Sequence, residues 1–157
     1  MRLFLASTPY DWAAVLKLVQ TAFAYMEGRI DPPSSMHRLT TEVIAKQAET
    51  GEVWMIEDQE TPVACVFLTR KPHALYLGKL AVAHTHRNRG LARQLLENAA
   101  IRAQELGFDR LELETRIELI ENHELFARLG FVRTGINAHT GYARPTSITM
   151  QKNLSNS

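Results

Sequence analysis

The feature that most constrains the fold of this chain is one stretch, residues 76–93, in which an apolar half leads into a basic turn and then into a helical pattern. A strand that turns directly into a helix leaves backbone N–H groups unpaired at the positive end of the helix dipole, where phosphate is the usual occupant. Gly90 has no Cβ, so an anion can approach its backbone closely. The apolar half ends at Leu80, Ala81 and Val82, and the turn reads Arg87, Asn88, Arg89, Gly90, Leu91, Ala92 and Arg93.

Two interpretations of this turn are open from these residues. It is either a phosphate-binding turn, in which Arg87, Arg89 and Arg93 add cationic field, or an ordinary strand-to-helix connection with solvated arginines. A Walker loop is excluded because no Gly-Lys-Ser/Thr follows. The dinucleotide GxGxxG motif is excluded because the turn lies in the middle of the chain and holds one glycine.

The spacing Arg87-x-x-Gly90-x-Ala92 resembles the Gln/Arg-x-x-Gly-x-Gly/Ala signature of the GCN5-related N-acetyltransferase (GNAT) family. Residues 80–82 resemble the coenzyme A strand of that family, and residues 110–116 resemble its next strand. Asn122 and residues 125–131 resemble its short helix, which closes on a Leu-Gly-Phe turn. These blocks follow the family's order and cover residues 75–134.

The resemblance implies a fold and a cofactor. The fold is a single GNAT-like domain over residues 1–157, of mixed α/β (α+β) class. Its central sheet is mixed, mostly antiparallel, with six to seven strands flanked by about four helices. The cofactor half is residues 75–134, the acceptor-site elements are residues 24–40 and 135–146, and a homodimer is possible. The resemblance implies acetyl-coenzyme A as co-substrate, held by residues 80–82, residues 87–93, Asn122 and Phe126.

Local patterns predict the individual elements. Helices are expected from a Ser7 or Thr8 cap to about Tyr25, from Thr40 to about Gly51, over residues 90–106, and within residues 117–129. Strands are expected at residues 3–5, 52–57, 62–69, 75–83, 111–115, 131–134 and 147–152.

Composition narrows the class of protein. The net charge of +1 gives no reason to expect a nucleic acid or an anionic membrane as partner. The single Cys65 excludes an internal disulfide and lies in an apolar run, so we expect a buried thiol and a cytoplasmic location. No apolar run is long enough to span a bilayer, and none at the N-terminus fits a secretory signal. His84 and His86 have no further ligands nearby, so no metal site is expected.

Acetylation of an amine needs a base, because an aliphatic amine with a reference pKa near 10.4 is almost fully protonated at neutral pH. Glu114 corresponds to the family's strand-borne glutamate and is the first candidate, with Glu112 on the same strand face as the second. The alternative for both is an exposed strand carboxylate paired with Arg110 or Arg116.

One residue departs from the family pattern. Many members carry a tyrosine at the position of Phe126, where it protonates the leaving thiolate, and phenylalanine has no proton to give. His123 or Tyr142 is a possible substitute, or no acid is needed because a thiol with a pKa near 8.5 is a fair leaving group. A second departure is the connection from Glu114 to Asn122, which is longer than in the ribosomal-protein acetyltransferases.

The acceptor is left open by the sequence. The loop after the first helix supplies Tyr25, Glu27, Arg29 and Asp31 as candidate substrate contacts, with Tyr142 from the later loop; the alternative is a solvated linker. Glu27 and Asp31 suit a cationic amine, whereas Arg29, Arg144 and His139 suit an acidic substrate. We favour a small-molecule primary amine over a peptide N-terminus. A non-catalytic acyl-coenzyme A-binding regulator and a nucleotide-binding module stay as alternative functions.

Overall fold

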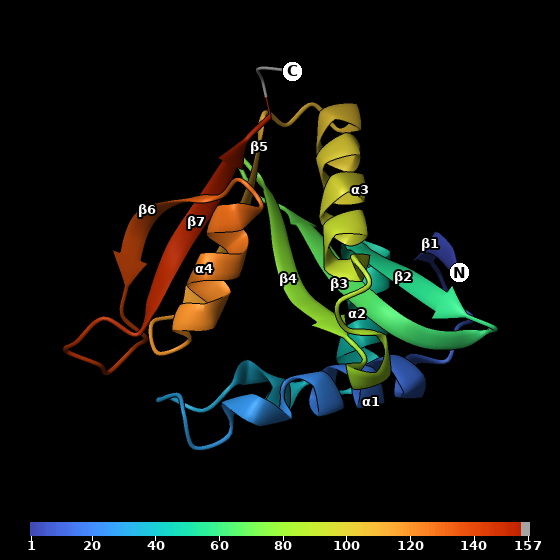
Figure 1. Cartoon of the computed structure of the whole chain (residues 1–157), viewed down its shortest axis with the longest axis horizontal. Coiled ribbons are helices and arrows are strands. Elements are labelled where there is room, and N and C mark those ends of the chain that lie inside the picture. The colour runs from blue at the N-terminus through green and yellow to red at the C-terminus, as the bar shows by residue number, and fades with distance from the viewer. Residues whose placement is uncertain (155–157) are drawn as a thin grey trace.

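A seven-stranded sheet runs through the computed structural model, which describes residues 1–154 (Figure 1). The strand order is β1-β2-β3-β4-β5-β7-β6, and every neighbouring pair is antiparallel except β4 and β5. The prediction of a mixed, mostly antiparallel sheet is therefore confirmed. The strands are β1 (Arg2–Ala6), β2 (Glu52–Asp58), β3 (Thr61–Arg70), β4 (Leu75–Val82), β5 (Arg110–Arg116), β6 (Val132–Asn137) and β7 (Ser147–Asn153).

Helices cover both faces of the sheet and bury two separate apolar clusters. α3 packs Leu91, Leu95 and Leu96 on one face, and Phe126 of α4 lies against the same cluster. α1 and α2 cover the opposite face, where Val15 and Ile44 are fully buried. The helices are α1 (Trp12–Ala22), α2 (Thr41–Thr50), α3 (Leu91–Glu105) and α4 (Ile120–Arg128), with 3₁₀ turns η1 (Ala24–Met26), η2 (Ser35–Arg38) and η3 (His84–His86).

The start of α1 differs from the prediction. Asp11, not Ser7 or Thr8, is its cap, because the Asp11 carboxylate accepts a hydrogen bond from the Ala14 amide at 3.1 Å. The cap of α2 is Thr40 as predicted, with its hydroxyl accepting from the Val43 amide at 3.2 Å. His84 and His86 lie in η3.

The sheet opens between β4 and β5. These two parallel strands pair only at Leu75 with Leu111 and at Tyr76 with Glu112. Beyond that point β5 stays paired with β7 to its end, while β4 stays with β3. Figure 1 shows the two strands spreading apart from a common end. The backbone edges of the diverging segments are therefore left without a neighbouring strand.

A bulge in β4 changes which side chains face α3. Between the pairs Phe67–Gly78 and Cys65–Ala81, β4 carries one residue more than β3, and Lys79 has a φ of 50°. One extra residue inverts the alternation of side chains along a strand. Leu80 and Val82 consequently pack with Leu77 on the α3 face, while Ala81 belongs to the cluster on the α1 and α2 face.

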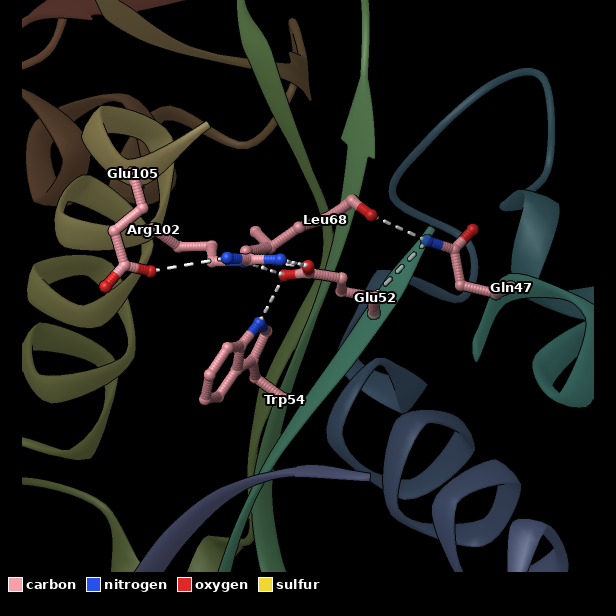
Figure 2. A network of polar contacts seen from close by, with 6 residues as sticks. All are labelled: Gln47, Glu52, Trp54, Leu68, Arg102 and Glu105. Carbon is pink, nitrogen blue, oxygen red and sulfur yellow. Dashed lines mark hydrogen bonds and ion pairs between the residues drawn. The ribbon is translucent and has the colours of Figure 1, made fainter. Parts of the chain in front are cut away.

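A polar network fixes helices of both faces to β2 and β3 (Figure 2). Arg102 of α3 donates to the Glu52 carboxylate at 2.7 Å, and the Trp54 indole donates to it at 2.8 Å. On the other face, Gln47 of α2 donates to the Leu68 carbonyl at 3.0 Å. Burial raises the pKa of Glu52, but the hydrogen bonds from Arg102 and Trp54 outweigh it, and the net pKa is lowered.

The Cys65 thiol is fully buried as predicted, and its burial raises the pKa to about 12. Among residues 1–154, no helix has the length and apolar content needed to cross a bilayer. The same residues contain no cluster of three or more His, Cys, Asp or Glu side chains arranged to hold a metal ion.

Candidate active site

The opening between β4 and β5 holds a cleft of about 600 Å³. Its two sides differ in character. The side toward α3 and α4 is apolar and includes Leu77, Leu80, Val82, Leu96, Leu113 and Phe126. The side toward the α1–α2 connection is polar and includes Arg38, Tyr76, Lys79, Glu114, Arg116 and His139. A long apolar chain fits the first side, and a charged molecule fits the second.

The basic turn before α3 has the geometry of an anion site. Gly90 is the N-cap of α3 with a φ of 77°, and Asn88 has a φ of 63°. No side chain of residues 1–154 caps this end of α3, so the first amides of the helix keep their hydrogen-bonding capacity. A Cβ built at Gly90 would meet nothing within 4 Å, so the backbone is open to a ligand. The exposed side chains of Arg87, Arg89 and Arg93 surround it.

A contact that sequence reasoning missed, between His86 and Asp58, holds this turn to the sheet. The His86 ring nitrogen Nε2 lies 2.8 Å from the Asp58 carboxylate at the end of β2. The hydrogen bond from His86 lowers the pKa of Asp58, and Arg89 adds to the lowering. The two residues are 28 positions apart in the sequence, and no motif links them.

Glu114 lies on the polar side of the cleft. Side chains alternate along a strand, and the neighbouring Leu113 packs in the cluster under α3. Glu114 therefore points to the opposite face of β5. Its carboxylate accepts hydrogen bonds from Asn137 Nδ2 at 3.0 Å and from Ser147 Oγ at 3.5 Å. The predicted alternative partners bind elsewhere, since Arg110 pairs with Asp109 and Arg116 donates to backbone carbonyls. Glu114 is thus oriented by neutral donors and carries its negative charge into the cleft.

Tyr76 is a cleft residue with no sequence signal. It precedes the bulge on β4 and lines the cleft with Glu114. Burial, together with the nearby charges of Glu114 and Glu112, raises the pKa of Tyr76 to about 12. Its hydroxyl therefore stays protonated and is a donor for a group bound beside Glu114.

The comparisons with known proteins agree with this geometry. The Acetyltransferase (GNAT) family matches residues 12–131, which is more than half of the chain. The chain therefore belongs to the GNAT family. The GNAT acetyltransferase structure from Staphylococcus aureus Mu50 is 16% identical, with a TM-score of 0.75 over 98% of each chain. A GNAT structure from Elizabethkingia anophelis, with acetyl-CoA bound, is 18% identical, with a TM-score of 0.71 over 98% of this chain and 97% of that one.

A curated relative of this GNAT chain covers only part of it. The N-alpha-acetyltransferase 30 of Saccharomyces cerevisiae is 34% identical over an alignment 77 residues long, which covers 46% of this chain and 44% of the yeast protein. The match thus spans less than half of that relative.

The structure of this GNAT chain brings only some of the predicted cofactor and catalytic residues into the cleft. Glu112 lies on β5 but is not among the residues that line it. The arginine turn is at the start of α3, on the same face as the apolar side. The predicted residues that line the cleft are Leu80, Val82, Ala92, Glu114, Asn122, Phe126 and Tyr25.

At the position where many GNAT members carry tyrosine, Phe126 lies against Phe131 with ring centroids 5.9 Å apart. Neither suggested substitute acid lies in the cleft lining. His123 Nε2 contacts the Arg116 carbonyl at 2.9 Å, and the Tyr142 hydroxyl donates to Asp31 at 2.6 Å. The tyrosine and histidine side chains of the lining are instead those of Tyr25, Tyr76 and His139.

The charged residues of the two acceptor-site loops are paired, either with one another or with α4. Arg29 forms a bidentate ion pair with Glu121 of α4, with N···O distances of 2.7 and 2.9 Å. His37 lies 2.6 Å from the Glu27 carboxylate. Asp31 accepts from Tyr142 and from Arg144, at 2.6 and 3.0 Å. Tyr25 accepts from Asn122 Nδ2 at 3.1 Å. These contacts join residues 25–37 to α4 and to the loop after β6.

Proposed function

We propose that this protein is an acetyl-coenzyme A-dependent N-acetyltransferase that transfers the acetyl group directly to a small primary amine in a ternary complex. The observation that carries the proposal is the cleft between β4 and β5, apolar on the side that leads to the uncapped start of α3 and carrying Glu114 on the other. Family membership supports the same reaction class.

The residues of this chain fit the co-substrate. The amides at Gly90 to Arg93 and the three exposed arginines suit a diphosphate. The diverging edge of β4, at residues 80–82, suits a pantetheine arm that binds like an added strand beside apolar side chains. Acetyl-coenzyme A supplies an acetyl group activated as a thioester. A backbone N–H near Val82 is the candidate donor to the acetyl oxygen.

On the polar side, Glu114 is the candidate base. Its carboxylate, held by Asn137 and Ser147, accepts a proton from the ammonium of the acceptor, directly or through a water. Tyr76 stays protonated beside it and donates a hydrogen bond that orients the bound amine or water. We keep Glu112 as the second candidate base. Tyr25 and the paired loop residues Glu27, Arg29 and Tyr142 are proposed to shape the acceptor entrance.

A thiol-release assay tests the proposal. Purified protein, acetyl-coenzyme A and a panel of amines are expected to release free thiol, with the acetylated amine as product. No transfer to any amine, together with tight binding of coenzyme A, would instead support a non-catalytic acyl-coenzyme A-binding regulator, which Phe126 in the usual tyrosine position favours.

A peptide N-terminus is the alternative acceptor. The partial match to a yeast N-alpha-acetyltransferase favours it. Peptides in the same thiol-release panel separate the two, since faster acetylation of peptides than of small amines would replace the small-molecule acceptor.

A further inference from the structure

The polar side of the cleft carries an excess of positive charge. Three cationic residues, Arg38, Lys79 and Arg116, line it, and Glu114 is the one carboxylate among the lining residues that the structure describes. Among the other charges near the entrance, Asp31, Glu27 and Arg29 are each paired with a group of opposite or potentially opposite charge. Glu118, which accepts from the Asp31 amide at 3.2 Å, adds one further negative charge outside the lining, and the three cations stay in excess. The sequence left an acidic and a cationic acceptor equally open, and these pairings remove the loop charges from that choice.

The three cations come together without a carboxylate in ion-pair contact. Lys79 Nζ donates to the Ser35 hydroxyl at 2.6 Å, a neutral partner. Arg116 donates to the Pro32 and Pro33 carbonyls, at 2.7 and 3.0 Å. Arg38 has no hydrogen-bond or ion-pair partner among the contacts found within residues 1–154. Glu118 and Glu114 act on Arg116 only at longer range.

The pKa of Lys79 is lowered in this cluster. Burial lowers the pKa of Lys79, and the charges of Arg38 and Arg116 lower it further. A bound anion relieves this repulsion, because an opposite charge stabilises the protonated form. The β4 bulge produces the arrangement, since Lys79 is the bulged residue and its side chain reaches Ser35 of η2.

The cations lie beside the candidate base. Glu114 and Arg116 are two residues apart on one face of β5, which separates their Cα atoms by about 7 Å. An amine at Glu114 and an anion at the cations are thus close enough to belong to one small molecule. The phosphate turn at Gly90 does not compete for this place, because it opens α3 on the opposite face of the sheet.

We propose that Arg38 and Lys79, supported by Arg116, form a subsite for a carboxylate of the acceptor, so that the acceptor is a small molecule bearing both a primary amine and a carboxylate. This inference deepens the proposed function and rests on it for the position of the amine. A polyamine is repelled by these cations. In a peptide, the first residue carries a peptide amide in place of its carboxylate.

The test compares matched acceptors. Free amino acids are assayed against the corresponding amino-acid amides, against short peptides with the same first residues, and against spermidine, all at saturating acetyl-coenzyme A. We expect at least one amino acid to have a kcat/KM about tenfold or more above that of its amide. Equal or faster acetylation of the amides, the peptides or spermidine overturns the subsite while leaving the acetyltransferase intact.

Variants localise the effect. Arg38→Gln and Lys79→Met are expected to raise the acceptor KM about tenfold or more, with kcat and the Kd for coenzyme A changed much less. Arg133→Gln and Lys17→Met, at exposed sites outside the cleft, are the matched controls and are expected to leave the KM unchanged. A KM for the amino acid that is insensitive to both cleft variants overturns the proposal.

Failure of the proposed function is distinguishable from failure of this inference. If no amine is acetylated, amino acids and their amides are compared by the rise in Tm of the coenzyme A-saturated protein. A larger rise with an amino acid than with its amide, reduced in Arg38→Gln, supports the subsite without any turnover. Equal or absent shifts for both sets overturn it.

Discussion

The two sides of the cleft are built from differently distributed parts of the chain. The apolar side and the anion turn come from residues 77–126, in one run of sequence. The polar side takes Lys79, Glu114 and Arg116 from the same run, but it also needs Arg38 from the α1–α2 connection and His139 from the loop after β6. The cofactor side is thus encoded within one run of sequence, whereas the acceptor side is completed by residues that the fold brings from distant parts of the chain. The two sides are therefore expected to fail independently when mutated.

The largest effect is expected from Glu114→Gln, which keeps the shape of the side chain but removes the base. We expect kcat/KM to fall by at least about 100-fold near neutral pH. The loss shrinks as pH rises toward the amine's own pKa, near 10.4 for an aliphatic amine, because the acceptor then deprotonates without help. The measurement is a pH–rate profile of both proteins.

Glu112→Gln is the matched control on the same strand face. It is expected to lose much less activity, because Glu112 is not part of the cleft lining. A larger loss in Glu112→Gln than in Glu114→Gln would transfer the role of base to Glu112, and an unchanged profile in both would remove the carboxylates from the mechanism.

The next effect is expected on the cofactor side, from Gly90→Val. At a φ of 77°, a β-branched residue is strained by roughly 1–2 kcal/mol and displaces the turn amides. We expect the Kd for coenzyme A to rise about tenfold, with the acceptor KM at saturating cofactor unchanged. Calorimetry and steady-state kinetics measure the two quantities.

Gly107→Val controls for strain alone, because Gly107 follows the other end of α3 with a φ of 88° and equally open surroundings. Both variants are expected to lose stability, but only Gly90→Val is expected to lose affinity. Equal affinities for coenzyme A in the two variants would show that the turn at Gly90 does not hold the cofactor.

A substitution outside the cleft is expected to change the stability of the protein and not its activity. Arg102→Met removes the partner of Glu52, whose side chain is 14% exposed, and is expected to lower the free energy of unfolding by about 1–2 kcal/mol. Because the folded-state pKa of Glu52 is lowered, this contribution is present above about pH 4.3 and lost as pH falls below it. Urea unfolding at pH 7 and pH 3 measures both.

The smallest effect is expected from Phe126→Tyr, which restores the hydroxyl that many GNAT members carry. We expect kcat to change by less than about threefold, since a thiol with a pKa near 8.5 leaves without an acid. A rise of tenfold or more would show instead that protonation of the thiolate limits the present reaction.

The predictable part of the molecule is the part governed by short-range patterns. The Thr40 cap, the strand pairs around residue 59 and the turn at Gly90 depend on neighbours in sequence, and the structure has them. The predicted cap of α1 was wrong, because Ser7, Thr8 and Asp11 all fit the N-cap preference and the residue type alone does not choose among them. Element bounds otherwise moved by a few residues at the ends.

The charge of the acceptor side was not predictable, because it depends on which ions pair across the fold. Asp31 with Arg144, and Arg29 with Glu121, are separated by about a hundred residues. The position of Lys79 depends on the β4 bulge. A signal for that bulge does exist, since the apolar residues Leu75, Leu77, Leu80 and Val82 shift by one from strict alternation.

The central claim is that the open start of α3 holds the diphosphate of an acyl carrier whose arm enters the cleft between β4 and β5. The most direct test is a calorimetric titration of the wild-type protein with coenzyme A, with pantetheine (which lacks the diphosphate) and with ATP. We expect saturable heat with coenzyme A and at least about 100-fold weaker binding of pantetheine and ATP. No heat with coenzyme A, equal affinity for pantetheine, or a preference for ATP would contradict it.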